Sequence, residues 1–448
     1  MRAIIAVGLA TSLAVACGGK SGADDDDGDG GNSPDACVGI ECQVVNCGAM
    51  SLPPTSISGT VFAPNGTLPL NNVNVYVPRD PLPPFVEGAT CDRCATTLPG
   101  SPIVQAISDA AGNFHLDNVP AGADIPLVIT TGKWRRQIVI PNVNQCGDNA
   151  LGTAETRLPK NKAEGDIPKI AITTGAADSM ECLARKLGIA DSEITNSAGA
   201  GRLHFYAGNG VAKFNGGFAG GPNQNLSGAD PFWSSLDALK AYDIVILSCE
   251  GSQLGGTNKS QGALDAMKAY ADLGGRVFAS HWHNIWISGK FQGGVGAPTP
   301  AVWNTIGMWS DNGNFGGTEL IDEVSNPKGA LFADWMVNVM ASTVRGEFPV
   351  TQGKATNNSI DTTKAERWVV QKGSTIPQMF QFTTPNEVPN DQRCGKVVFT
   401  DMHVSGQIQG GDYPDSCVGG AGNLTLTPQE KALAFMFFDI AGCVGGIF

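Results

Sequence analysis

Two of the five histidines in this 448-residue chain lie in the segment "SHWHNIW" at residues 280–286. His281 and His283 come at the end of a predicted strand, where residues two apart point to the same side. His403 follows another predicted strand. Two imidazoles on one face and a third from a neighbouring strand suit Zn²⁺ or a similar divalent ion. The sequence therefore predicts a candidate metal site of His281, His283 and His403. The simpler alternative is that polar residues at the strand ends hydrogen-bond to one another.

A nucleophilic site is the second interpretation of the same region. Ser280 or Cys249 would be the nucleophile, with His403 as the base and Asp401 beside it. Gly251 supplies the small residue that a tight turn after Cys249 needs, but the Gly-x-Cys-x-Gly pattern of a nucleophile elbow is absent. A buried structural thiol is the favoured interpretation of Cys249. No complete catalytic set follows from the sequence.

Tryptophans form a third signal, because five of the eight in the chain fall between residues 282 and 335. A Trp- and Gly-rich insertion, at about residues 284–365, contains the loops "FQGGVGAPTP" and "SDNGNFGG" and is expected to cover the site. Indole rings on such loops can stack on sugar rings. Core packing is expected for about three of the five, Trp335 included. The candidate ligand-binding residues are Glu250, Trp282, Trp286, Trp303 and Trp309.

Alternating strand and helix patterns in residues 166–448 would position these side chains. Apolar runs such as "PKIAITTG", "YDIVILSCEGS" and "RVFASHWH" predict strands that are buried on both faces. Helices are predicted by "DSMECLARKLG", with Asp178 as its cap, by "GALDAMKAYADLGG", and by a last segment that opens with "TPQE", where Thr427 is the cap and Glu430 completes a capping box. This alternation indicates an α/β domain with a mainly parallel sheet. Ligands of such sheets bind beyond the carboxyl ends of the strands, where all the candidate residues above would meet.

The order of these elements resembles the class I glutamine amidotransferase-like fold, of flavodoxin-like type, and within it the trehalose-utilisation-protein-like branch. The segments that carry the resemblance are "YDIVILSCEG", "YADLGGRVFASHWH" and "CGKVVFTDMHVSG". In amidotransferases the strand after the glycine pair ends in a catalytic cysteine on a tight elbow. Ser280 or His281 stands there in this chain, so glutamine hydrolysis is not expected. His403 matches the late histidine of the family.

Residues 55–150 are predicted to form a small β-sandwich, because β-branched, alternating segments are separated by turn residues. The segments "SGTVFAPNGTLPLNNVNVYV" and "SDAAGNFHLDNVPAG" resemble the carboxypeptidase regulatory-like family of transthyretin-like sandwiches. That family is a non-catalytic accessory module, and related sandwiches bind carbohydrate. The chain departs from the family in a proline-rich insertion, Pro78–Gly100, which carries Cys91 and Cys94.

The first 16 residues have the pattern of a signal peptide, since Arg2 precedes an apolar stretch too short to span a bilayer. The stretch ends in "LAVAC", which resembles a bacterial lipobox, although Ala14 stands where leucine is more usual. The resemblance implies a lipid on Cys17 and attachment to the cell envelope, at the outer membrane or cell surface. Plain secretion is the alternative. Residues 17–36 are predicted to form a disordered acidic Gly/Asp tether, and residues 37–54 a cysteine-containing lead-in.

Export predicts that the cysteines pair. Without Cys17, six cysteines precede residue 150 and five follow it. The even group is expected to close on itself, whereas the odd group leaves one thiol, for which Cys249 is the candidate. A formal net charge of −13 argues against a nucleic-acid partner.

Three functions therefore stay open. The favoured one is a membrane-anchored extracytoplasmic lipoprotein that binds a ligand, for which the tryptophan pattern predicts a glycan. The second is a metal-assisted or serine-type hydrolase that uses the 281/283/403 histidine cluster. The third is a structural envelope lipoprotein.

Overall fold

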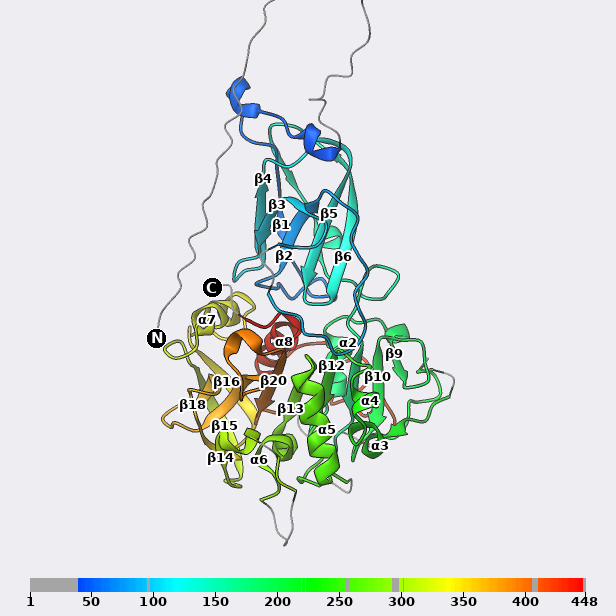
Figure 1. Ribbon diagram of the computed structural model, residues 1–448, viewed down its shortest axis with the longest axis vertical. Helices are drawn as coiled ribbons and strands as arrows, with labels where there is room; N and C mark the ends of the chain where they lie inside the picture. The colour runs from blue at the N-terminus through cyan, green and yellow to red at the C-terminus, as the bar shows by residue number, and fades with distance from the viewer. Residues whose placement is uncertain are drawn as a thin grey trace, which may run out of the picture. The chain divides into compact units, whose positions relative to one another are not determined.

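The computed structural model describes residues 39–94, 97–218, 220–221, 223–254, 258–291, 298–300, 302–404 and 410–445 (Figure 1). The predicted signal peptide, Cys17 and the acidic tether lie outside these residues. Residues 39–448 form one compact unit. Two 3-10 helices precede its first strand, at Ile40–Gln43 and Cys47–Met50.

Two small sheets form the β-sandwich that follows. The three-stranded sheet has the order β4-β1-β7, with β1 at Ser56–Thr60, β4 at Asn113–Asp117 and β7 at Asp148–Ala150. The four-stranded sheet has the order β3-β2-β5-β6, with β2 at Asn74–Pro78, β3 at Pro102–Ile107, β5 at Gly122–Thr131 and β6 at Trp134–Val143. Exposed and buried side chains alternate along β4, which turns Phe114 and Leu116 into the core. The predicted strands of this part are therefore present.

An eleven-stranded mixed sheet organises the rest of the chain. Its order is β11-β10-β8-β12-β13-β20-β19-β18-β15-β16, with β9 paired to β10. The parallel part contains β8 (Ile170–Thr173), β9 (Ile194–Asn196), β10 (Leu203–Ala207), β11 (Ser227–Gly228), β12 (Ile244–Leu247), β13 (Arg276–Ser280) and β20 (Gly395–Thr400). The antiparallel part contains β15 (Asn314–Ile321), β16 (Glu347–Lys354), β18 (Glu366–Gln371) and β19 (Pro377–Thr384).

The order of the central parallel strands is β10-β8-β12-β13-β20, so the first strand in the chain lies between the second and the third. This is the order of one common class of doubly wound sheets. Every residue of β8, β12, β13 and β20 is buried, which explains their uninterrupted apolar sequences. The alternation in the sequence thus predicted the parallel half of the sheet.

Three longer helices accompany the sheet: α5 (Gln261–Asp272), α7 (Gly329–Asn338) and α8 (Pro428–Ala441). The predicted capping box of α8 is confirmed, because the Thr427 side chain accepts from the Glu430 amide and the Glu430 side chain accepts from the Thr427 amide. The shorter helices are α1 (Thr153–Thr156), α2 (Leu183–Lys186), α3 (Ala229–Trp233), α4 (Leu236–Leu239) and α6 (Ile285–Ser288), with 3-10 turns at Met180–Cys182, Asp191–Glu193, His281–Asn284, Val302–Thr305 and Asn390–Gln392.

The Trp- and Gly-rich insertion differs from its prediction as a set of long loops. It contains β15, α7 and β16, together with an antiparallel ribbon of β14 (Gly307–Trp309) and β17 (Asn357–Ile360). The glycines and tryptophans of this insertion therefore lie largely in strands and in the core. The part of the loop "FQGGVGAPTP" at residues 292–297 lies outside the described residues.

Glu319 on β15 is fully buried, and neither carboxyl oxygen has a hydrogen-bond partner among the described residues. Burial, and then the charge of Asp401, raise the pKa of Glu319 to about 8, from 4.5. The folded state thus keeps a proton that the unfolded chain releases, so stability falls as the pH rises between these values. Relative to Glu319→Gln, the wild type should lose up to about 1.4 kcal/mol per pH unit between about pH 5 and pH 8. Urea unfolding at several pH values measures this, and parallel pH profiles would contradict it.

The pairing of the cysteines corrects the expectation that the six early ones close on themselves. Four disulfides join described residues: Cys47–Cys146, Cys91–Cys394, Cys94–Cys443 and Cys182–Cys417. Cys42 is also disulfide-bonded. Cys91 and Cys94 leave the early group because the proline-rich insertion lies against the α/β part, where the Ala89 amide donates to the Lys240 carbonyl. Cys249 is free and buried, as predicted. These disulfides indicate an oxidising, extracytoplasmic environment.

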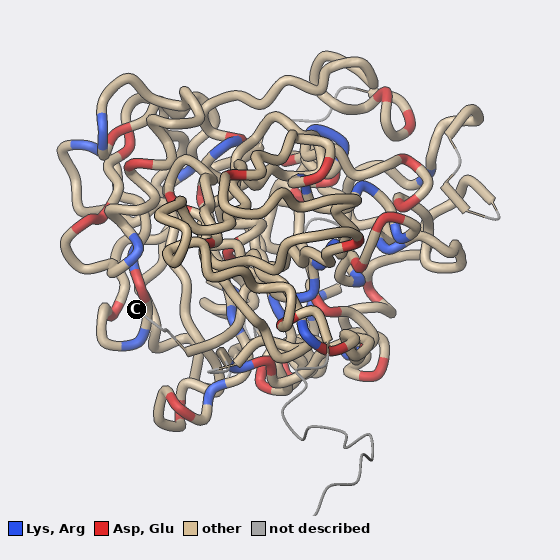
Figure 2. Tube along the Cα trace, turned by 90° about the horizontal axis from the view of Figure 1, so that it is seen from above, with Lys and Arg blue, Asp and Glu red and all other residues tan. Residues whose placement is uncertain are grey.

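Acidic and basic residues are interspersed along the chain in the view of Figure 2. Among the described residues, no helix has both the length and the apolar character needed to cross a bilayer.

Candidate metal centre

The candidate centre lies where three neighbouring strands end. The strands β12, β13 and β20 are adjacent, parallel and paired up to their last residues, so their carboxyl ends meet at one edge (Figure 1). Cys249 follows β12 by two residues, His281 follows β13 directly, and His403 follows β20 by three. The loop after β8 adjoins them. This is the edge, next to the reversal of strand order between β8 and β12, at which such sheets bind ligands.

The backbone at His281 explains why the prediction for the two early histidines was wrong. Strand β13 ends at Ser280, and His281 opens a 3-10 helix with a φ of 42°. His281 and His283 therefore do not share one face of a strand. A φ in the left-handed region is uncommon for a non-glycine residue and is found at sites where the surrounding structure imposes it.

Cys249, His281 and His403 form a compact group of potential ligands. The Sγ of Cys249 lies 3.3 Å from the Nδ1 of His281, and the Nε2 of His403 lies 3.2 Å from the same nitrogen. All three atoms lie within 4.8 Å of one another, and all three residues are buried. A tetrahedral zinc ion has ligand distances that place neighbouring S and N atoms about 3.3–3.6 Å apart. The group therefore has the ligand chemistry of a zinc or related metal site, and the two distances from the His281 Nδ1 have its spacing.

The two contacts of the His281 Nδ1 compete for one proton or one lone pair. The Nδ1 faces both the Cys249 thiol and the His403 ring, yet one ring nitrogen either donates one proton or offers one lone pair. Without a cation the two contacts share that proton or lone pair, so at least one of them is weaker than an ordinary two-centre hydrogen bond. A metal ion at the centre of the three atoms would accept a lone pair from each.

The surroundings favour neutral imidazoles and a protonated Cys249 thiol, so metal binding would have to displace the thiol proton. Burial lowers the pKa of His403 to about 3, and burial followed by the charge of His403 holds the pKa of His281 well below its usual value. Neutral imidazole is the form that binds metals. Burial raises the pKa of the Cys249 thiol to about 12, while hydrogen bonds from the backbone of Trp282 and Gly251 act in the opposite direction. Such outer contacts orient metal ligands and stabilise their charge.

His283, the third predicted ligand, is not part of the group. Its Nδ1 accepts a hydrogen bond of 2.9 Å from the Trp286 indole, and its Nε2 then donates to the Ser248 carbonyl at 2.9 Å. Both ring nitrogens are therefore used in structural hydrogen bonds. The third potential ligand in the structure is Cys249 instead of His283.

The side chains of the predicted serine site are not brought together. The Ser280 hydroxyl donates to Asp178 at 2.5 Å rather than to a histidine. The Asp401 carboxylate accepts from the amides of Thr356 and Asn357 and from the Thr356 hydroxyl, so it anchors the start of β17 instead of orienting His403. Burial raises the pKa of Asp401 to about 6.

The predicted sugar-binding residues are also in structural contacts. The carboxylate of Glu250 is buried in an ion pair with Lys259, whose ammonium lies 4.9 Å from the centre of the Trp233 ring. Trp286 and Trp303 are at most 1% exposed, and Trp282 is 7% exposed. Trp309 is half-buried and packs edge-on against Phe399. Trp282, Trp286 and Trp303 therefore belong to the core and offer no open stacking surface, whereas Trp309 packs against the core and is partly exposed.

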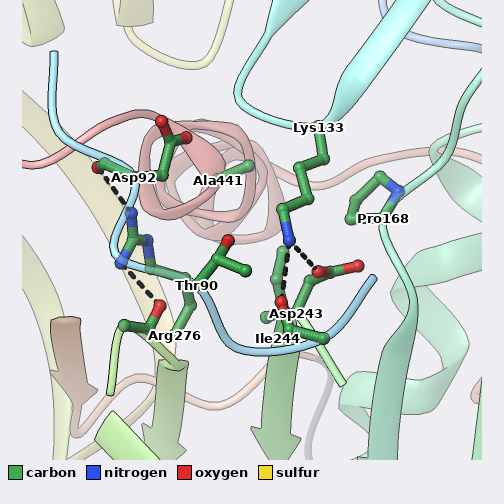
Figure 3. A pocket seen from close by; sticks show the side chains of 10 residues that line it. Thr90, Asp92, Lys133, Pro168, Asp243, Ile244, Arg276 and Ala441 are labelled. Atoms are coloured by element: carbon green, nitrogen blue, oxygen red, sulfur yellow. Dashed lines mark hydrogen bonds and ion pairs between the residues drawn. The ribbon is translucent and has the colours of Figure 1, made fainter. Parts of the chain in front are cut away.

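A second polar region lies at the opposite edge of the sheet. Figure 3 shows the Lys133 ammonium directed at Asp243, before β12, and the Arg276 guanidinium beside Asp92. Arg276 also donates to the carbonyls of Gly274 and Cys394. The adjoining cavity of about 280 Å³ is lined by Pro84, Phe85, Val86, Glu87, Lys133, Lys162, Gly165, Asp166, Ile167, Arg202 and Asp243. Its charged groups pair with one another, as in Lys133–Asp243 and Arg202–Glu87. This region joins the proline-rich insertion to the sheet.

No protein-family model matches the chain. No curated protein matches it either. Among solved structures, a cytoplasmic protein from Salmonella typhimurium is similar at 12% identity and a TM-score of 0.31, over 61% of this chain and 99% of that one. A β-galactosidase from Rahnella sp. R3 is similar at 13% identity and a TM-score of 0.28, over 53% and 29%. An exo-β-1,4-mannosidase from an Opitutaceae bacterium is similar at 10% identity and a TM-score of 0.22, over 53% and 31%. Scores this low support no conclusion about function.

Proposed function

We propose that this protein is an extracytoplasmic metal-binding protein, and that Cys249, His281 and His403 hold one divalent ion, for which zinc is the best fit. The observation that carries the proposal is the convergence of a thiol and two ring nitrogens within 4.8 Å in a buried place. Thiolate and imidazole together are ligands typical of zinc. The Nδ1 of His281 contacts both other candidate ligand atoms, Cys249 Sγ and His403 Nε2. A metal ion bound to all three atoms would explain this arrangement better than hydrogen bonds among them.

Glycan binding, which the tryptophan pattern predicts, has less support because the rings of Trp282, Trp286 and Trp303 are buried. A serine-type hydrolase also has less support, since Ser280 hydrogen-bonds to Asp178. Export is supported by the signal-like first 16 residues and by the disulfides. We include in the proposal a lipid on Cys17 that attaches the protein to the bacterial envelope. The strand order supports a flavodoxin-like α/β domain of the kind found in glutamine amidotransferase-like proteins.

Metal content tests this proposal. The exported protein, purified without chelators and loaded with zinc, should contain about one ion per chain by elemental mass spectrometry. Cys249→Ala and His403→Ala should each lose the ion. His115→Ala is the matched control, because His115 is exposed on the sandwich, and it should keep the ion. A wild type that retains no zinc, or an ion that survives both ligand substitutions, would refute the proposal.

A further inference from the structure

Asp178 is a buried carboxylate that holds the segments next to two of the proposed ligands. It is 0% exposed and lies in the loop after β8. Its Oδ2 accepts from the Ser280 hydroxyl at 2.5 Å, and its Oδ1 accepts from the Val404 amide at 2.7 Å. Ser280 directly precedes His281, and Val404 directly follows His403. The prediction of Asp178 as a helix cap was therefore wrong: the carboxylate reaches across to two other loops.

The backbone of the same loop contacts the third ligand. The amides of Ala177 and Asp178 donate to the Cys249 carbonyl at 3.0 Å and 3.2 Å. The His403 ring also hydrogen-bonds to the backbone of Ala177. Two consecutive residues thus touch all three ligand-bearing segments, which places the Asp178 charge beside the candidate metal centre.

None of the ion pairs formed by the described residues includes the Asp178 carboxylate. By contrast, the buried carboxylates of Glu250, Glu430 and Asp439 have lysine partners, which are Lys259 for Glu250, Lys186 for Glu430, and Lys328 and Lys396 for Asp439. A fully buried carboxylate without a cation is expensive. A metal ion in the adjoining centre would supply the missing positive charge.

Charge counting favours a particular class of ion. A divalent ion bound to the Cys249 thiolate leaves one positive charge, and the Asp178 carboxylate brings the sum to zero. A monovalent ion such as Cu⁺ is already neutral with the thiolate, so the same carboxylate would leave a buried negative charge. The charge of Glu250, which directly follows Cys249, is balanced by Lys259. Glu181, whose side chain accepts from the Ser248 hydroxyl, adds no charge at neutral pH because burial raises its pKa to about 8.

We propose that Asp178 is a specificity-determining residue, which makes the Cys249/His281/His403 centre select a divalent ion such as Zn²⁺ over monovalent copper. This inference rests on the proposed function. Asp178 acts through its charge and through the two loops that it holds, since its carboxylate oxygens already accept hydrogen bonds from Ser280 and Val404.

The test measures the affinities of Asp178→Asn for Zn²⁺ and for Cu⁺, each by competition with a chromophoric chelator. Asparagine has the same shape, and its oxygen can accept from the Val404 amide while its nitrogen donates to the Ser280 hydroxyl. Zinc affinity should fall by about 10- to 100-fold, and Cu⁺ affinity by less than about threefold. Asp178→Ser, which also removes the charge, repeats the test in case the asparagine variant folds poorly. Asp243→Asn, which changes a buried carboxylate at the opposite end of the sheet, before β12, is the control and should match the wild type.

The possible results distinguish a failure of the proposed role of Asp178 from a failure of the proposed metal site. An equal loss for both ions would show that Asp178 only supports the loops, and unchanged affinities would show that it has no part in the centre; either result overturns the inference and leaves the metal site standing. A wild type that binds neither ion overturns the proposed function and the inference together.

Discussion

Zinc should raise the free energy of unfolding of the wild-type protein by about 2.7 kcal/mol when the free ion is at 100 times its dissociation constant. The reason is that Cys249, His281 and His403 come from loops 32 and 122 residues apart, so the unfolded chain does not assemble the three ligands. Urea unfolding with and without zinc, under conditions that keep the disulfides intact, measures the difference. Cys249→Ala should lose nearly all of this stabilisation, because the remaining two imidazoles lack the thiolate charge.

The control for this prediction is His115→Ala, whose zinc-dependent stabilisation should equal that of the wild type. Each variant is compared with its own chelator-treated form, so that a change in packing at residue 249 does not enter the difference. Equal stabilisation of the wild type and of Cys249→Ala by zinc would mean that the ion binds elsewhere on the protein.

Replacing Lys259 by methionine should destabilise the protein by about 3–5 kcal/mol. Lys259 is 1% exposed, forms an ion pair with the buried Glu250 carboxylate, and lies over the Trp233 ring. Methionine fills a similar volume but leaves the negative charge of Glu250 buried with fewer partners. Chemical unfolding gives the change directly.

The double variant Glu250→Gln/Lys259→Met distinguishes charge from packing. It should be more stable than Lys259→Met alone, because the uncompensated charge is gone. Lys240→Met, at an exposed ion pair with Asp237, is the matched control and should leave stability unchanged within error. Destabilisation of the double variant equal to the sum of its single variants would contradict a coupled buried pair.

The sequence predicted the secondary structure correctly for segments whose hydrophobic pattern or capping residues lie within the segment itself. The buried run at 244–247 predicted a strand covered on both faces, and the Thr427/Glu430 pair predicted the start of α8. Because strand and helix periods differ, these segments need no knowledge of distant partners. The antiparallel strands β15, β16 and β18 were missed, since their glycines and tryptophans resemble loop and binding sequences until their neighbours in the sheet are known.

The sequence predicted the position of the candidate site, at the ends of three strands, but not which residues form it. A strand that ends at Ser280 rather than at His283 changes which histidine faces His403, because side-chain direction depends on single residues. Cys249 was expected to be a free buried thiol, and only the structure places it beside His281. Asp178 gave no signal, since a carboxylate that bonds to loops about 100 and 226 residues away looks like a helix cap in the sequence.

X-ray absorption spectroscopy at the zinc edge identifies the atoms bound to the metal. The zinc-loaded wild type should show one sulfur at about 2.3 Å and imidazole nitrogens at about 2.0–2.1 Å. Cys249→Ala should lose the sulfur scatterer. A first shell made only of oxygen and nitrogen in the wild type, or one with two or more sulfurs, would contradict a Cys249/His281/His403 centre.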